Sequence, residues 1–355
     1  MTSLAHRIRL AAAIVVSLAA GSTLALPGTA TATATAHSGN PCGSVASSAP
    51  VAKGLYQTAY SERNHVLWAT SSVGEPLVTN SSLVKLDPHT LKVEATYRPP
   101  VTDPETGAVE AVYGIAVDDE HNSVWTTNTR DNSVGVYSQR TGKRLASLPG
   151  VNHAREVVVD EKHNLAWASS FADGSVVAFD TRTYKEKKRV TLAGSSPAGM
   201  AVDERTGTAY ATDFANDRII EITPRAKSPR LIPTGDNPLS IALSKDGRTA
   251  YSADQAAGTV SVINLRKGAV TKTVPTGAGA KSVATDPRSG LVLVANRTTA
   301  TVTVVDPHKG TVVDSLTTGA NTNHVHVAHG AAFVAAKSGS GPEGQDLLHR
   351  FPLGH

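Results

Sequence analysis

Hydrophobic and polar positions alternate over short runs along most of the chain, and polar turns separate the runs. The stretch 241–275 shows the pattern, because it reads IALS, TAYSAD, TVSVINL and AVTKTVP, with KDGR, AAG and RKG between these runs. Val, Ile, Thr and Tyr with alternating polarity favour β-strands, whereas Gly, Asp, Asn and Pro mark turns. The pattern therefore predicts four antiparallel strands in this stretch.

The same unit recurs along the chain, and each copy carries one large residue near the start of its second strand. The successive separations of these anchors are 57, 42, 43, 41, 42 and 40 residues, and the anchors are Trp68, Trp125, Trp167, Tyr210, Tyr251, Leu293 and Phe333. A four-stranded repeat of this period is typical of a β-propeller blade, and such sheets must stack to bury their faces. We predict an all-β, seven-bladed propeller of four-stranded antiparallel blades over residues 52–355.

The seventh copy is one strand short. It offers HVHVAH (324–329), AAFVAAK (331–337) and DLLHRFPL (346–353) and then reaches the end of the sequence. An unpaired edge there would leave backbone donors and acceptors without partners. We therefore predict that a strand from the N-terminal tail, residues 37–51 and specifically near Ser44–Lys53, closes the ring. The alternative is that this tail frays.

The second and third strands of the copies resemble a known repeat. The second strands read WTTN, WASS, YATD, YSAD and LVAN, and third strands read VVAFD, TVSVIN and TVTVVD. These segments resemble the YVTN family of β-propeller repeats and, within it, the secreted or periplasmic YncE-like proteins, which are seven-bladed. The resemblance covers residues 52–355. It implies the architecture but no single activity, because the family includes binding modules, surface proteins and a few enzymes.

The first 36 residues have the features of a signal peptide. Arg7 and Arg9 precede an apolar run from Leu10 to Leu26, and Ala34-Thr35-Ala36 matches an A-x-A cleavage site. We expect a secreted or extracytoplasmic protein without a membrane span in its mature form; a transmembrane helix is the alternative. The single cysteine, Cys42, excludes an intrachain disulfide.

Net charge does not favour nucleic acid as the partner. The chain carries +4, and removal of Arg7 and Arg9 with the leader leaves 4 − 2 = +2. The basic run at 184–189 falls on a predicted outer edge strand, where lysines commonly block pairing between sheets. Nucleic-acid binding stays open because the YncE-like resemblance implies it.

Two loop positions of every repeat are expected on one face, around the central channel. The residue before the innermost strand gives one ring, in which turn geometry does not require the charged or aromatic members: Tyr56, Tyr113, Arg155, Ala198, Leu239, Lys281 and Asn323. Together with His153, Glu156 and His324, this ring would hold an anionic or sugar-like group. The residue that ends the second strand gives a second ring of ligand candidates, for which turn capping is the alternative: Asn128, Asp213, Asp254 and Asn296.

Candidate metal and catalytic groups are few. His324 and His326 would share one side of a strand, and His153 or Glu156 could complete a metal site, but no compact ligand motif is present. We therefore expect neither a metal nor a cofactor, and the sequence contains no G-x-S-x-G or P-loop motif. A lactonase or lyase that uses His153, Glu156 and His324 is the enzymatic alternative.

We expect binding rather than turnover. The predicted protein is a monomeric binding or scaffold propeller that recognises a small molecule, a cell-envelope component or a protein at the channel mouth. Two insertions, 71–82 and 98–114, and the Gly-rich segment 338–344 are expected to decorate the same mouth.

Overall fold

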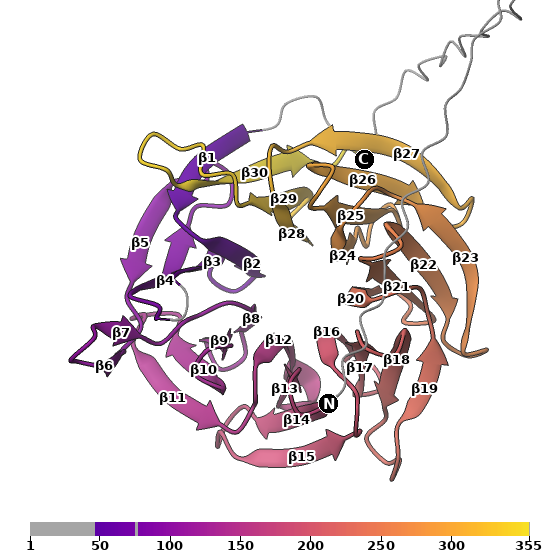
Figure 1. Ribbon diagram of the computed structural model, residues 1–355, viewed down its shortest axis with the longest axis horizontal. Coiled ribbons are helices and arrows are strands. Elements are labelled where there is room, and N and C mark those ends of the chain that lie inside the picture. The colour runs from indigo at the N-terminus through magenta and orange to yellow at the C-terminus, as the bar shows by residue number, and fades with distance from the viewer. Residues whose placement is uncertain (1–46, 75–76, 355) are drawn as a thin grey trace, which may run out of the picture. The chain divides into compact units, whose positions relative to one another are not determined.

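The computed structural model describes residues 47–74 and 77–354, and these residues form a ring of seven four-stranded antiparallel sheets (Figure 1). The predicted all-β, seven-bladed architecture is confirmed. The predicted signal peptide, residues 1–36, and residues 37–46 of the tail lie outside the described residues. Within the described part of the chain, no helical segment is long and apolar enough to cross a membrane.

Each blade runs from an innermost strand at the channel to an outermost strand at the perimeter. Blades 1 to 4 contain β2 (Leu55–Ser61), β3 (Val66–Val73), β4 (Asn80–Leu86) and β5 (Val93–Tyr97); β8 (Ile115–Asp118), β9 (Ser123–Asn128), β10 (Ser133–Ser138) and β11 (Arg144–Pro149); β12 (Ala154–Asp160), β13 (Leu165–Ser170), β14 (Ser175–Asp180) and β15 (Glu186–Thr191); β16 (Pro197–Asp203), β17 (Thr208–Asp213), β18 (Arg218–Ile222) and β19 (Arg230–Pro233). Blades 5 to 7 contain β20 (Pro238–Leu243), β21 (Thr249–Asp254), β22 (Thr259–Asn264) and β23 (Ala269–Pro275); β24 (Ala280–Thr285), β25 (Val292–Asn296), β26 (Thr301–Asp306) and β27 (Thr311–Thr317); β28 (Thr322–Ala328), β29 (Ala331–Ala336), β30 (Asp346–Pro352) and β1 (Ser47–Ala52).

The apolar core lies between the blades, and the repeat anchors are part of it. Each anchor belongs to a cluster of buried residues that combines its own blade with the next one. Trp68, for example, packs with Val112 and Ile115 of the second blade, and Phe333 of the last blade packs with Leu55 of the first. Because a blade buries its faces only against its neighbours, the seven sheets depend on one another for their stability.

An N-terminal strand closes the ring, as predicted. β1 pairs antiparallel with β30, from Ser47 opposite Arg350 to Ala52 opposite Asp346. The Ser48 hydroxyl lies 2.6 Å from Nδ1 of His349, and Ala49 and Val51 pack against the core between the last and first blades. The closing strand thus satisfies the edge that β30 would otherwise expose.

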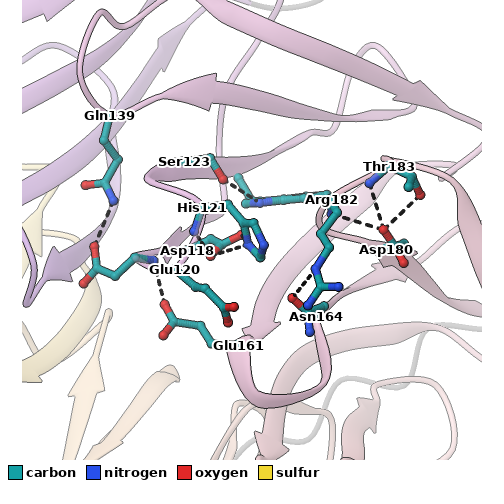
Figure 2. A network of polar contacts seen from close by, with 12 residues as sticks. Asp118, Glu120, His121, Ser123, Gln139, Glu161, Asn164, Asp180, Arg182 and Thr183 are labelled. Carbon is teal, nitrogen blue, oxygen red and sulfur yellow. Dashed lines mark hydrogen bonds and ion pairs between the residues drawn. The ribbon is translucent and has the colours of Figure 1, made fainter.

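The turns between first and second strands lie on the face opposite the predicted mouth. Asp118 accepts a hydrogen bond from the backbone N–H of His121 at 2.9 Å and lies 2.8 Å from its Nδ1 (Figure 2). Asp160 and His163 repeat the arrangement around the short 3₁₀-helix η1 (Glu161–His163). Glu161 also accepts a hydrogen bond from the backbone of Asp119 in the preceding blade at 2.6 Å. These residues therefore connect turns and adjacent blades.

The two insertions that follow the first anchor contact each other. Residues 98–114 contain a hairpin of β6 (Val101–Asp103) and β7 (Ala108–Val109), and the Val109 N–H donates to the Val78 carbonyl at 2.8 Å. Figure 1 shows this hairpin at the outer edge of the ring, between β5 and β11. Of the described residues in these insertions, those at the flanks, such as Gly74 and Tyr113, line the mouth that the sequence predicts for both.

Candidate functional site

A β-bulge places the first ring of predicted residues. The pairing of the innermost strand with the second strand shifts register at this position in six blades: between Leu55 and Thr58, Ala154 and Val157, Pro197 and Met200, Pro238 and Ser240, Ala280 and Ser282, and Thr322 and His324. A bulge bends a strand and redirects a side chain, and bulges are frequent next to functional sites. The bulges therefore turn Tyr56, Arg155, Ala198, Leu239, Lys281 and Asn323 toward the channel.

Hydrogen bonds from the preceding blade hold several of these positions. Thr127 donates through its hydroxyl to the carbonyl of Arg155 at 3.2 Å, and Ser169 donates to that of Ala198 at 2.6 Å. Thr70 bonds in the same way to the Tyr113 carbonyl. At the ring closure, the Asn323 side-chain amide donates to the Tyr56 carbonyl at 2.8 Å. The backbone of the ring is therefore fixed between blades.

These residues converge on a narrow cavity of about 40 Å³, which we call the waist. It is lined by residues from six blades: Tyr56, Gln57, Arg155, Glu156, Ala198, Gly199, Leu239, Ser240, Lys281, Ser282, Asn323 and His324. The volume suits a few water molecules or the end of a small ligand. The structure thus brings together six of the seven ring residues that the sequence selected, and it places Glu156 and His324 beside them.

A wider cavity of about 560 Å³, the mouth, opens outside the waist. Tyr56 and Arg155 line both cavities, so the two are adjacent. Tyr113 and His153 lie in the mouth: Tyr113 meets Tyr56 edge to face at 4.9 Å, and the His153 ring lies 5.6 Å from that of Phe171. His153 also has a φ of 51°, so it takes a left-handed turn position filled by Gly or Asn in other blades.

Positive charge dominates both cavities. Arg155, Lys281, Arg297 and Lys337 line them, and none of these four has a carboxylate ion-pair partner among residues 47–74 and 77–354. Arg155 lies over the Phe171 ring at 5.3 Å and Lys337 over the Tyr56 ring at 4.9 Å. Both oxygens of the nearby Asp346 accept backbone N–H groups, those of Leu55 and Gly339, each at 2.9 Å.

The crowding of cations alters the ionisation of Lys281. Burial, followed by the charges of Arg155, Arg297 and Lys337, lowers the pKa of Lys281 from 10.5 to about 7. The pKa of Lys337 is lowered as well, first by burial and then by Arg297, although Asp346 opposes the shift. Like charges held close together cost free energy, and a bound anion would offset that cost.

The acid and the imidazole of the waist, and His326 on its far side, are uncharged or partly charged near neutrality. Burial raises the pKa of Glu156 to about 7, although Gln57 donates a hydrogen bond to its carboxyl at 3.0 Å. Burial, then the charges of His326 and Lys281, lowers the pKa of His324 to about 3, and its Nδ1 accepts from the Thr58 N–H at 3.4 Å. Burial also lowers the pKa of His326 to about 4.

The predicted candidates at the ends of the second strands occupy a different environment. Asn128, Asp213, Asp254 and Asn296 are all fully buried and line neither cavity. Asp254, for example, accepts hydrogen bonds from Ser252 and Ser261, each at 2.7 Å. Arg218 pairs with Asp213 at 2.8 Å. Asp213 also accepts the backbone N–H of Ser196 at 2.9 Å, as a turn cap would, whereas the partners of Asp254 are hydroxyl groups. These contacts favour a structural role, and a ligand role for these four stays a prediction.

The histidines do not assemble a metal site in the described part of the chain. Residues 47–74 and 77–354 contain no group of three or more His, Cys, Asp or Glu side chains that could hold an ion. His324 and His326 line a cavity of about 450 Å³ on the far side of the waist, whereas His153 lies in the mouth. The three candidate ligands thus do not share one cavity.

Sequence reasoning missed several residues of the site, among them Gln57 and Arg297. Gln57 hydrogen-bonds Glu156, and Arg297 contributes a mouth cation, yet each simply follows a residue that the repeat alignment selects, Tyr56 and Asn296. A bulge exposes two consecutive residues on one side of a strand, so Gln57, which follows a bulged ring member, could have been included. Arg297 follows the end of β25, where no bulge marks it.

Known proteins with similar sequences support the architecture. The chain is 25% identical over 236 residues to the uncharacterized protein YncE of Escherichia coli O157:H7, and 24% identical to that of Salmonella typhimurium LT2; each match covers 62% of this chain. Together with the seven blades, these matches confirm that the chain resembles YncE. The chain is a YncE-like β-propeller. It spans 64% of the length of these curated relatives.

Structural similarity extends beyond the YncE-like proteins. A chain of Kuenenia stuttgartiensis hydrazine synthase superposes with a TM-score of 0.66 at 14% identity, over 81% of the YncE-like chain and 93% of that chain. At this identity the likeness shows the fold alone. No protein-family model matches the sequence, so membership of the YVTN repeat family stays a prediction.

Proposed function

We propose that the protein is a secreted binding propeller that holds an anionic small molecule, or an anionic group of a cell-envelope component, at the channel mouth. One observation carries this proposal: Arg155, Lys281, Arg297 and Lys337 line the waist and the adjoining mouth, and none of them has a carboxylate ion-pair partner among the described residues. Guanidinium and ammonium groups that lack partners bind carboxylates and phosphates through charge-assisted hydrogen bonds. Export rests on the signal-peptide features of residues 1–36.

Calorimetric titration with inorganic phosphate and with citrate tests the proposal. A hydrogen bond to a charged group contributes about 1.5–3 kcal/mol, so Arg155→Ala or Lys281→Ala should weaken binding about 10- to 100-fold. Arg248→Ala is the matched control, because its side chain is 85% exposed on the opposite face. Wild-type protein that binds neither anion, or variants with an unchanged dissociation constant, would refute the proposal.

Nucleic acid is the second candidate because the mouth combines cations with the Tyr56–Tyr113 pair. Proteins that bind single strands commonly use basic grooves with aromatic rings for base stacking. Here each tyrosine packs on the other and Lys337 covers one face of Tyr56, which favours a small anion. Fluorescence anisotropy with a labelled oligothymidylate distinguishes the two, since Tyr113→Ala should weaken only oligonucleotide binding.

Turnover has weaker support. Glu156 and His324 meet at the waist as the enzymatic alternative requires, but His153 lies apart from them. The waist itself, at about 40 Å³, is too small for a lactone or sugar ring, although both groups also line the cavity of about 450 Å³ on its far side.

A further inference from the structure

Lys281 is set apart from the other mouth cations by its position. It lies on the bulge at the start of β24 and lines the waist, whereas Arg297 and Lys337 line only the mouth. Among the described residues it has no hydrogen-bond or ion-pair partner for its amine. A lysine held in this way near other cations is a common form of nucleophilic lysine.

We propose that Lys281 captures the carbonyl group of a small anionic aldehyde or oxo acid as a reversible imine. The inference rests on the proposed anion binding, because Arg155 and the mouth cations would hold the anionic group of the same molecule. The waist would accept only its carbonyl end.

The ionisation of the waist suits this chemistry at neutral pH. With a pKa of about 7, close to half of the Lys281 amine is neutral at pH 7 and has a free electron pair. The Glu156 carboxyl, whose pKa is also about 7, is close to half protonated there. One residue can thus supply the nucleophile and the other a proton.

The step balances without any other reagent. The amine nitrogen of Lys281 bonds to the carbonyl carbon. One proton passes from this nitrogen to the former carbonyl oxygen, and a carbinolamine results. Protonation of its hydroxyl by Glu156 lets water leave as the C=N bond forms, and the nitrogen-bound proton returns to the carboxylate. Hydrolysis reverses each step. Because capture needs a neutral amine and is catalysed by a protonated acid, its rate should be greatest near pH 7.

Borohydride trapping of the full chain with glyoxylate tests the inference, with peptide mapping by mass spectrometry as the readout. We expect at least tenfold more reduced adduct on Lys281 than on the exposed Lys92, and inorganic phosphate should suppress it. Acetaldehyde, which lacks the anionic group, should form less adduct on Lys281 than glyoxylate does, because the mouth cations do not hold it. Lys281→Arg removes the nucleophilic amine and should form no adduct at this position.

Each outcome separates the two proposals. If Lys281 reacts no more than Lys92 while phosphate still binds, imine capture is wrong and anion binding stands. If the wild type fails to bind phosphate and Lys281 reacts equally with both aldehydes, anion binding is wrong and so is the preference for anionic carbonyls. The competition by phosphate needs no variant, so poor folding of Lys281→Arg would not remove the test.

Discussion

Replacing Lys281 with methionine should stabilise the protein, and by an amount that depends on pH. Burial and three neighbouring cations lower the pKa of Lys281 to about 7 in the folded state, against 10.5 when it is unperturbed. Between these values the unfolded chain binds more protons than the folded one, so stability rises with pH from 7 to about 10.5. Methionine keeps the length of the side chain and removes the titration.

The expected size follows from linkage. The shift of about 3.5 pKa units corresponds to about 4 kcal/mol of destabilisation at pH 7 and about 2 kcal/mol at pH 9, at 1.36 kcal/mol per unit. These figures are upper limits because the waist opens to the solvent-filled mouth. Phosphate should narrow the difference, because a bound anion stabilises the charged amine of the wild type only.

Urea unfolding of the wild type and Lys281→Met at pH 7 and pH 9 measures the effect. The variant should be the more stable protein at pH 7, and the gap should shrink at pH 9. Arg248→Met on the exposed opposite face serves as the control for adding an apolar side chain. Equal stability at pH 7, or a difference that does not change with pH, would show that burial and the neighbouring cations do not lower the pKa of Lys281 as described.

Three further results are expected. Replacing both His324 and His326 with Asn should reduce the loss of stability between pH 6.5 and pH 4. Their folded pKa values of about 3 and 4 lie below that of an exposed histidine, so each costs the wild type up to about 1.4 kcal/mol for every pH unit of acidification. Identical stability profiles of wild type and variant in acid would contradict this. Gly199→Ala should cost about 1–3 kcal/mol in thermal or urea unfolding, because its Cβ would lie 2.5 Å from the Ser240 Cα of the next blade; a neutral change would show that the blades separate freely. Deleting residues 47–52 should lower the melting temperature by exposing the edge of β30, and an unchanged melting temperature would mean that the closing strand does not stabilise the ring.

The repeat made the fold predictable, whereas the site required knowledge of local backbone geometry. Alternating strands and regularly spaced anchors are sufficient for counting blades, since each anchor has the same packing role. The spacing also placed Arg155 and Lys281 on one ring. It could not distinguish Asp254, whose carboxylate accepts hydrogen bonds from serine hydroxyls of its own blade, from a residue that faces the channel, because both are polar residues at loop positions.

The part that the sequence could not supply depends on distances between blades. The pKa of Lys281 depends on Arg155, Arg297 and Lys337, which belong to other blades or to other positions of the same blade. Similarly, no repeat position marks Gln57 as the partner of Glu156. Such pairings between distant segments appear only when the ring radius and the bulges are known.

The pairing of β1 with β30 joins a segment that is synthesised early to one that is synthesised late, since Ser47 lies opposite Arg350. A ribosome must therefore translate nearly all of the chain before the first strand finds its place. A nonsense mutation in any blade would produce an incomplete ring in which β1 has no partner and the last complete blade exposes one face, and such a product should be sensitive to proteases. A circular permutant that starts at another blade boundary would, in contrast, restore a continuous final sheet and should fold.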